Sequence, residues 1–188
     1  LGRDVLLIER FDRLLGEQRR AMISALTMLG LDEVMGRYAS YADLADFILE
    51  RFSDALPSLR DLFSRIVFNI LVGNTDDHAR NHSAFWDGNE LTLTPAYDIC
   101  PQLRSGGEAS QAMAIGRDGF RMSQVAGCVT AAPTYRLTEA EAREIVDHQI
   151  ETIRSRWGEA CDLARLTEVE RAYFWKRQFL NPYALESY

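Results

Sequence analysis

Cysteines are few and far apart in this sequence. Cys100, Cys128 and Cys161 are odd in number and include no CxxC pair, which argues against a disulfide framework and against a zinc ribbon. Long apolar stretches are missing as well, since no run approaches the roughly 20 residues that a membrane helix needs, and no signal peptide precedes the first residue. We therefore expect a cytoplasmic protein that makes no contact with a membrane.

Basic residues are also fewer than acidic ones. The 21 lysines and arginines are outnumbered by 28 acidic residues, which gives a formal net charge of −7. Because no extended basic block occurs, direct binding to nucleic acid is not expected. The 188 residues, 47% of them hydrophobic and 26% charged, suffice for one sizeable core or for one lobe of a larger enzyme.

Helical patterning is abundant. Apolar residues recur three and four apart in several stretches; Ser40 or Asp43 is suited to cap one, while Thr138 and Thr167 each begin a capping box with a Glu three residues later. The predicted helices are residues 25–29, 40–52, 58–72, 138–158 and 169–180. Short strands are predicted at residues 5–10, 20–24, 83–86, 91–94 and near 113–115. The sequence thus predicts a mainly α (α+β) fold.

A dense polar cluster follows the predicted helix 58–72. The apolar run 66–72 leads directly into residues 74–81, whose charged and polar side chains include Asp76, Asp77, His78, Arg80 and Asn81. A hairpin is predicted next, because Asp-Gly at residues 87–88 is strong turn chemistry between two β-like runs. Asp98 then places another carboxylate just beyond the second strand.

The spacing of these side chains points to phosphoryl transfer. Asp76 and Asn81 are five residues apart, and Asp98 lies one hairpin later. In protein kinases a catalytic-loop Asp serves the substrate hydroxyl, the Asn five residues later holds Mg²⁺, and a later Asp holds Mg²⁺ across the phosphates. Mg²⁺ is a hard cation that prefers oxygen ligands. The pattern therefore predicts a site for Mg²⁺ and ATP.

Other interpretations of the same cluster are open. His78 and His82 are four apart and could face one zinc ion if they lay on a helix, yet the Glu of zinc protease motifs is missing between them. A metal-dependent hydrolase, including a phosphohydrolase, is therefore the weaker alternative. Asp77 and Arg80 are expected to make local salt bridges or caps rather than to act in catalysis.

Four segments together resemble one known family. They are IERFDR at residues 8–13, MISALTMLG at 22–30, NTDDHARNHS at 74–83 and LTPAYDICP at 93–101. They resemble the HipA family of bacterial serine/threonine kinases, the toxin half of HipA/HipB toxin–antitoxin systems. The resemblance extends to about Trp157, and it implies the helical C-lobe of a protein-kinase-like fold with a small β-hairpin at the active site.

The resemblance also implies residue roles. Asp76 would be the catalytic Asp, Asn81 and Asp98 the metal ligands, and His78 a residue that positions the loop. Both the family motif and the five-residue spacing select Asp76 over Asp77.

The first residues of the chain would form the hinge between the two kinase lobes. In the family, ERFDR lies at this hinge, so the resemblance implies that Glu9 and Phe11 frame the adenine pocket and that residues 1–15 form a hinge-like strand and turn. Without the resemblance, Phe11 would be assigned to the core and Glu9 to an ion pair with Arg10 or Arg13.

One part of the family pattern is not found. A full HipA-like kinase carries a phosphate-binding loop and an ATP-contacting lysine before the hinge, whereas the single lysine here, Lys176, lies near the C-terminus. Residues 1–188 are therefore predicted to be a C-terminal lobe without its N-terminal lobe, weak or inactive alone.

The predicted function is ATP-dependent phosphorylation of a Ser or Thr hydroxyl in a protein substrate. A HipB-like antitoxin is the expected partner. The alternative from another class is a non-enzymatic module that binds such an antitoxin.

Overall fold

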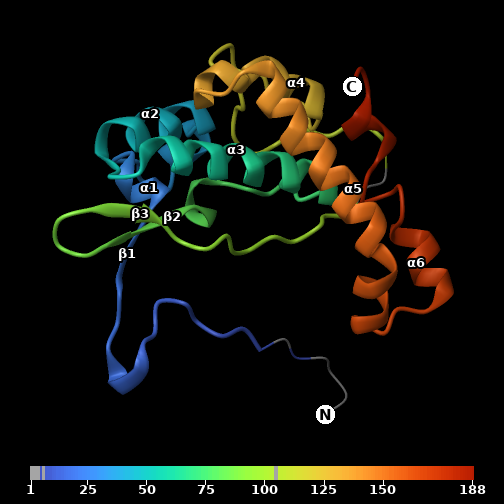
Figure 1. The fold of residues 1–188 in the computed structure, drawn as a ribbon, viewed down its shortest axis with the longest axis horizontal. Coiled ribbons are helices and arrows are strands. Elements are labelled where there is room, and N and C mark those ends of the chain that lie inside the picture. Colours follow the sequence, from blue (N-terminus) through green and yellow to red (C-terminus); the bar gives the residue numbers. More distant parts are fainter. Residues whose placement is uncertain (1–4, 6, 104–105) are drawn as a thin grey trace.

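The chain forms a mainly helical body with a small sheet, as predicted. The computed structural model describes residues 5, 7–103 and 106–188 (Figure 1). About half of the chain is helical when short 3₁₀ turns are included. The α-helices are α1 (Ala25–Met28), α2 (Tyr41–Arg51), α3 (Ala55–Val72), α4 (Val125–Ala131), α5 (Glu139–Leu163) and α6 (Glu168–Phe174).

The sheet has three antiparallel strands in the order β1-β2-β3. They are β1 (Ala21–Ser24), β2 (Ser83–Trp86) and β3 (Leu91–Leu93). The β2–β3 hairpin is the predicted one, and the Asp87 side chain closes its turn by accepting the N–H groups of Asn89 and Glu90 at 2.9 and 2.8 Å. The predicted strand at residues 20–24 is confirmed as β1, and its pairing with β2 extends the hairpin to a three-stranded sheet.

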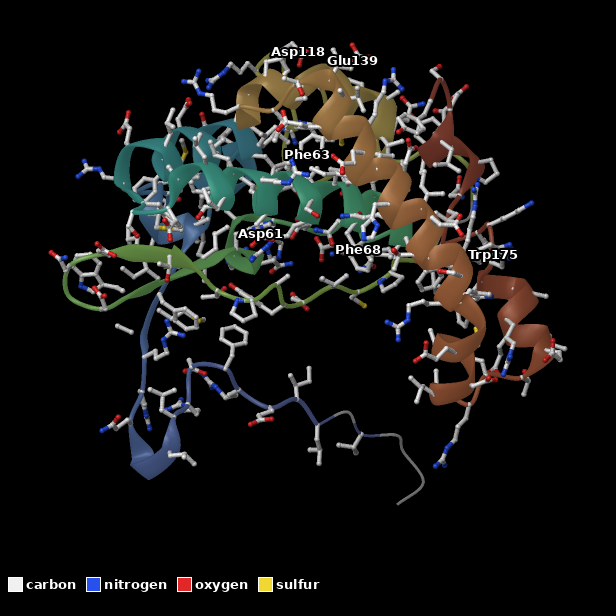
Figure 2. The ribbon with its side chains drawn as sticks, viewed as in Figure 1. Asp61, Phe63, Phe68, Asp118, Glu139 and Trp175 are labelled. Carbon is white, nitrogen blue, oxygen red and sulfur yellow. The ribbon has the colours of Figure 1, made fainter. Side chains whose placement is uncertain are left out.

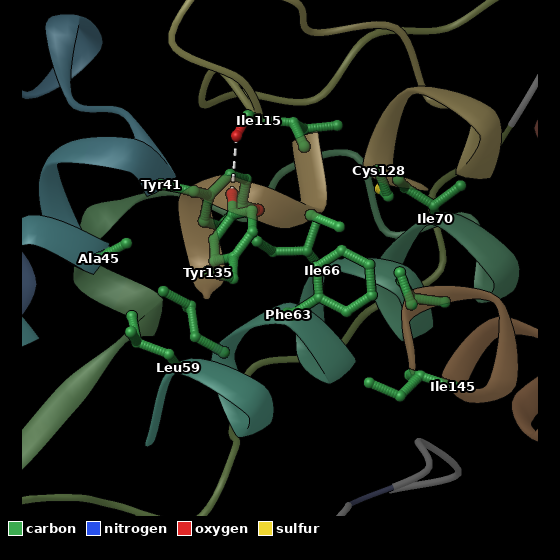
Figure 3. Packing of buried hydrophobic residues seen from close by; sticks show 14 of the residues in the cluster. Tyr41, Ala45, Leu59, Phe63, Ile66, Ile70, Ile115, Cys128, Tyr135 and Ile145 are labelled. Carbon is green, nitrogen blue, oxygen red and sulfur yellow. Dashed lines mark hydrogen bonds between the residues drawn. The ribbon is translucent and has the colours of Figure 1, made fainter. Parts of the chain in front are cut away.

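Helix α3 is the centre of the core. It lies between the sheet and the later helices (Figure 1), and its buried face includes Phe63, Ile66 and Ile70. Tyr135 packs on Phe63 with ring centroids 5.4 Å apart, and its hydroxyl donates a hydrogen bond of 2.7 Å to the carbonyl of Ile115 (Figure 3). The predicted core helix is thus confirmed, with a start at Ala55 rather than at residue 58.

Two helix ends differ from the prediction. Helix α5 starts at the predicted Thr138 capping box but continues past Gly158 to Leu163. Its continuation buries Cys161 at 1% exposure, and this burial outweighs the weak helix propensity of one exposed glycine. Helix α6 stops at Phe174, because the chain then turns back and the Leu180 N–H donates to the Leu71 carbonyl at 2.7 Å.

Helix α4 was missed by the sequence analysis. Its residues, VAGCVTA, are small, and they give no extended apolar stripe.

Two predicted strands are not formed. Residues 5 and 7–10, the described part of the predicted first strand, adopt no regular structure, and Leu7 and Ile8 are 90% and 76% exposed. A strand needs a partner for its backbone groups, and this segment runs apart from the helical body (Figure 1). The predicted strand near 113–115 is reduced to a single bridge between Ser40 and Ala114. Residues 1–4 and 6 of the predicted hinge lie outside the described residues.

None of the helices within the described ranges is long and apolar enough to cross a membrane.

Candidate active site

The polar cluster is positioned by the end of α3. Gly73 caps the helix in the left-handed conformation, with φ of 75°, and its N–H returns to the carbonyls of Asn69 and Ile70. A Cβ atom at Gly73 would lie 2.7 Å from the backbone carbonyl oxygen of Gln178. Glycine is therefore required here both for the backbone conformation and for the close approach, and the chain turns sharply into the loop that holds the predicted catalytic residues.

Asp77 anchors this loop from inside the protein. Its side chain is buried, and its Oδ2 accepts hydrogen bonds from the Tyr41 hydroxyl at 2.6 Å and from the Asn69 amide at 2.7 Å. The same oxygen lies 2.9 Å from Nε2 of His82, which is also buried. One carboxylate thus ties the loop to α2, to α3 and to the residue before β2.

The electrostatics of this anchor favour an ionised Asp77. Burial acts to raise the pKa of the Asp77 carboxyl, but the charge of His82 and the hydrogen bonds from His82, Tyr41 and Asn69 outweigh it, so that the pKa is lowered. The pKa of Tyr41 is raised well above its usual value by burial and by the neighbouring Asp77. Tyr41 therefore stays protonated and donates to a charged acceptor, which strengthens the bond.

Asparagine side chains connect the loop to the segment that carries Asp98. The amide of Asn74 donates to Asn69 Oδ1 at 3.0 Å and to the Asp98 carbonyl at 3.5 Å. Asn81 donates its amide to the Asp76 carbonyl at 3.3 Å. The carboxylates of Asp76 and Asp98 belong to exposed residues. The loop that carries Asp76 and Asn81 is therefore hydrogen-bonded to the segment that carries Asp98.

Tyr97, next to Asp98 in the sequence, also links its segment to the loop of residues 74–81. Its hydroxyl donates to the Arg80 carbonyl and lies 2.6 Å from the Ser83 hydroxyl. Phe11 packs against Tyr97 and Phe85, with ring centroids 5.9 and 5.8 Å away. The predicted hinge residue Phe11 is thus half-buried in an aromatic cluster beside the loop.

The other predicted hinge residue, Glu9, is exposed. The ion pairs that were considered for Glu9 are made by Asp12, which lies 2.8 Å from the Arg10 guanidinium and 3.5 Å from that of Arg13. Nothing in these contacts assigns Glu9 to a nucleotide.

Asn81 and Asp98 provide oxygen atoms that suit a hard cation. Because the Asn81 Nδ2 donates to Asp76, the Oδ1 atom is the end of this amide available as a ligand. Among the described residues, no group of three or more His, Cys, Asp or Glu side chains is arranged to hold a metal. Mg²⁺ usually binds through one or two protein oxygens together with substrate phosphates and water, so the pair fits a phosphate-bound Mg²⁺.

The histidines give no support to a zinc site. Residues 79–81 form only a short 3₁₀ turn, so His78 and His82 do not share the face of an α-helix. His82 directs Nε2 to Asp77, while His78 is half-buried and its Nδ1 has no hydrogen-bond partner among the described residues. Arg80 and Asp77 both form salt bridges, as the sequence analysis expected, but only the Asp77–His82 pair is local. Glu33 is 47 residues from Arg80, and Asp77 also accepts from Tyr41, 36 residues away.

Sequence reasoning missed the residues that support the loop. Tyr41, Asn69, Asn74 and Tyr97 were not singled out, although Asn69 is a conspicuous polar residue in a strongly apolar helix. A buried asparagine needs hydrogen-bond partners, so Asn69 could have indicated a polar network at the end of α3.

Comparisons with known proteins bear on the family and the fold of the chain. The family of HipA-like C-terminal domains matches residues 1–157. A protein of Haemophilus influenzae with the name "Putative kinase" is 40% identical over 64 residues, which are 34% of this chain and 19% of that protein. The chain thus spans about a fifth of the curated relative.

A solved structure has the same fold. It is the complex of HipA, HipB and operator DNA from a toxin–antitoxin system of Shewanella oneidensis MR-1, and the matching chain superposes with a TM-score of 0.73 at 21% identity. The match covers 88% of this chain and 44% of that chain. The helical body with its small sheet is therefore the protein-kinase-like fold of HipA, and the chain belongs to the family of HipA-like C-terminal domains.

Proposed function

We propose that this chain is the catalytic lobe of an ATP-dependent kinase that phosphorylates Ser or Thr hydroxyls of a protein. One observation carries the proposal: Asp76, Asn81 and Asp98 have the order and spacing of kinase catalytic side chains, and the segments that hold them are joined by hydrogen bonds of Asn74 and Tyr97.

Each residue has a distinct task in this proposal. Asp76, with its exposed carboxylate, orients the substrate hydroxyl and accepts its proton. Asn81 and Asp98 supply oxygen ligands to Mg²⁺, which when bound neutralises charge on the ATP phosphates. His78 positions the loop.

The nucleotide base is proposed to lie near the N-terminal segment. Phe11 offers an aromatic ring beside the loop, and Glu9 is the accompanying polar residue. The setting is proposed to be the cytoplasm, where ATP is available and where the free cysteines stay reduced.

The metal half of the site can be tested by calorimetry. This chain is titrated with MgCl₂ and a non-hydrolysable ATP analogue, and the same titration is made with Asp98→Asn. We expect Mg²⁺-dependent binding that is lost in the variant. Asp54→Asn is the matched control, because it removes another exposed carboxylate, one that makes no capping bond at the start of α3. Equal binding by all three proteins would refute the assignment of Asp98.

Phosphate transfer needs a longer protein. The chain covers 44% of the solved HipA chain, so transfer from labelled ATP is assayed in a full-length protein that contains this lobe. Asp76→Asn is expected to spare nucleotide binding and to lower transfer by at least about 100-fold. Normal transfer by this variant would remove Asp76 from the mechanism.

A partner-binding role is the second candidate. It is favoured by the solved relative, in which HipA forms a complex with HipB. If the chain only binds a HipB-like antitoxin, replacing both Asp76 and Asp98 by Asn should leave the affinity for that antitoxin unchanged while nucleotide binding is absent from the unmodified chain.

A further inference from the structure

The turn that follows α6 completes the end of α3. This C-terminal turn, residues 175–181, brings the Leu180 N–H to the Leu71 carbonyl at 2.7 Å. The final carbonyls of an α-helix have no partner within the helix, so the turn supplies a donor that α3 itself cannot provide. Residues 175–181 lie beyond the match to the family of HipA-like C-terminal domains, which ends at residue 157. The last turn of α3 is therefore stabilised by a part of the chain outside that match.

Gly73 is the point at which the C-terminal turn meets both segments of the candidate active site. The Gln178 carbonyl oxygen would lie 2.7 Å from a Cβ atom at Gly73, so the two backbones are in close contact. The Gly73 carbonyl accepts the N–H of Gln102 at 2.9 Å, which ties down the segment that follows Asp98. The loop of residues 74–81 begins directly after Gly73. One junction thus joins the C-terminal turn, the loop and the segment of Asp98.

Hydrogen bonds and burial hold the C-terminal turn in place. Asn181 is 5% exposed; its amide donates to the Arg177 carbonyl at 2.8 Å, and its Oδ1 accepts the Tyr183 N–H at 2.9 Å. Leu180 is buried and has φ of 50°, a left-handed conformation that is unfavourable for leucine. Such a conformation persists only where the surrounding contacts enforce it. The contacts of the turn therefore keep its backbone in one conformation.

Aromatic packing joins the turn to α5. Figure 2 labels Trp175, the first residue of the turn, where the chain leaves α6 beside α5. Trp157 of α5 contacts Trp175 and Phe179, with ring centroids 5.1 and 4.8 Å away. Because Phe179 lies between Gln178 and Leu180 in the chain, this packing fixes the backbone that contacts the end of α3.

We propose that the C-terminal turn is a positioning element of the candidate active site. By its contact with Gly73, it fixes the direction in which the loop of residues 74–81 leaves α3 and the place of the segment that carries Asp98. The consequence for catalysis rests on the proposed function, because Asp76 and Asn81 act from that loop. The turn itself touches neither substrate nor metal in this proposal.

Amide hydrogen exchange tests the proposal without any ligand. In the 188-residue chain, Phe179→Leu removes the ring contact with Trp157 and keeps an apolar side chain, so the turn is loosened while Gly73 is unchanged. We expect the amides of Leu180 and Gln102 to exchange at least about fivefold faster in this variant, because both lie in hydrogen bonds of the junction.

Two controls separate this local effect from a general loss of stability. The Phe52 amide, bonded to the Ile48 carbonyl at the end of α2, should keep its exchange rate in Phe179→Leu. Tyr173→Leu changes an aromatic residue of α6 that is 44% exposed, and it should leave the Gln102 amide unchanged. Unchanged exchange of Gln102 in Phe179→Leu would overturn the proposal, as would equal acceleration of Gln102 and Phe52.

A second pair of variants tests the contact at Gly73 itself. The Cβ atom of Gly73→Ala would lie 2.7 Å from the Gln178 carbonyl oxygen, whereas that of Gly30→Ala meets no atom within 4 Å at a similar φ of 65°. Both variants carry a similar backbone cost, so their difference reports the contact with the turn. We expect Gly73→Ala alone to lower the affinity for Mg²⁺ and the ATP analogue by at least about tenfold, measured by calorimetry on the folded proteins.

The two experiments distinguish this proposal from the proposed function. Equal affinities of Gly73→Ala, Gly30→Ala and a binding-competent unmodified chain would overturn the positioning role of the turn. An unmodified chain that binds no Mg²⁺ and nucleotide would count against the proposed function alone, because hydrogen exchange in Phe179→Leu decides the role of the turn without nucleotide.

Discussion

Asp76 and Asp77 are neighbours in the sequence, yet they lie in opposite surroundings. Asp77 is 2% exposed and shares its Oδ2 among Tyr41, Asn69 and His82, whereas Asp76 is exposed and uses its backbone carbonyl to hold Asn81. The comparison separates two surroundings: the inner carboxylate holds the loop in place, and the outer one is exposed, as its proposed catalytic role requires. Asp98 belongs with Asp76, since it is exposed as well.

The largest effect on stability is expected when the inner carboxylate, Asp77, is removed. Asp77→Ala leaves two donors and the buried His82 without their acceptor, so we expect the free energy of unfolding to fall by about 3–5 kcal/mol. Asp76→Ala should change it by no more than about 0.5 kcal/mol, because that side chain is exposed. Urea denaturation of both variants measures the difference, and similar losses in the two would contradict this separation.

Acid should weaken the contacts of the inner carboxylate, Asp77. The pKa of Asp77 is lowered in the folded protein from its ordinary value of 3.8, so its stabilisation is complete above pH 3.8 and is lost as the pH falls through the lower folded pKa. Urea midpoints measured from about pH 6 downward should therefore decrease more steeply for the unmodified chain than for Asp77→Asn. Parallel decreases would show that other groups cause the acid sensitivity.

Removing one hydrogen-bond donor to Asp77 should lower the free energy of unfolding by less than removing Asp77 itself. Tyr41→Phe deletes the 2.6 Å hydrogen bond to a buried, charged acceptor and keeps the packing of the ring, so a loss of about 1.5–3 kcal/mol in unfolding free energy is expected. Tyr173→Phe is the control, since Tyr173 is 44% exposed, and it should be nearly neutral. A neutral Tyr41→Phe would mean that Asn69 and His82 suffice to hold Asp77.

Replacing the outer carboxylate Asp98 should have a small effect on stability, and one that depends on the backbone conformation that the new residue must adopt. Asp98 has φ of 57°, a left-handed conformation that Asn adopts readily and Ala does not. Asp98→Asn is expected to keep the unfolding free energy within about 0.5 kcal/mol, and Asp98→Ala to lower it by about 1–2 kcal/mol. Thermal unfolding of the pair distinguishes the backbone effect from the loss of charge.

Much of the fold was predictable because it depends on local patterns. The capping boxes of Thr138 and Thr167 are both formed, Ser40 caps α2, and the Asp87 turn closes the hairpin. These signals act within a few residues, so tertiary contacts change them little. The end of α5 was misjudged for the opposite reason: burial of Cys161, a tertiary effect, carries the helix past Gly158.

For the candidate site, spacing along the chain singled out Asp76, Asn81 and Asp98, and their roles remain predictions. The buried hydrogen bonds that hold their loop in place were not predictable from spacing. Tyr41 and Asn69 are 36 and 8 residues from Asp77 along the chain, and no local pattern brings them together. The exposed conformation of residues 7–10 was missed because an apolar run looks the same whether or not a partner strand is present.

The sequence by itself determined most of the helices, three of their N-caps, the hairpin turn, the order of the predicted catalytic side chains and the resemblance to HipA kinases, because all of these depend on short-range patterns. Only the tertiary structure decided which of two adjacent carboxylates is buried and how β1 joins the hairpin. These features depend on contacts between residues far apart in the chain, and burial and hydrogen bonding are defined only once those residues are packed together.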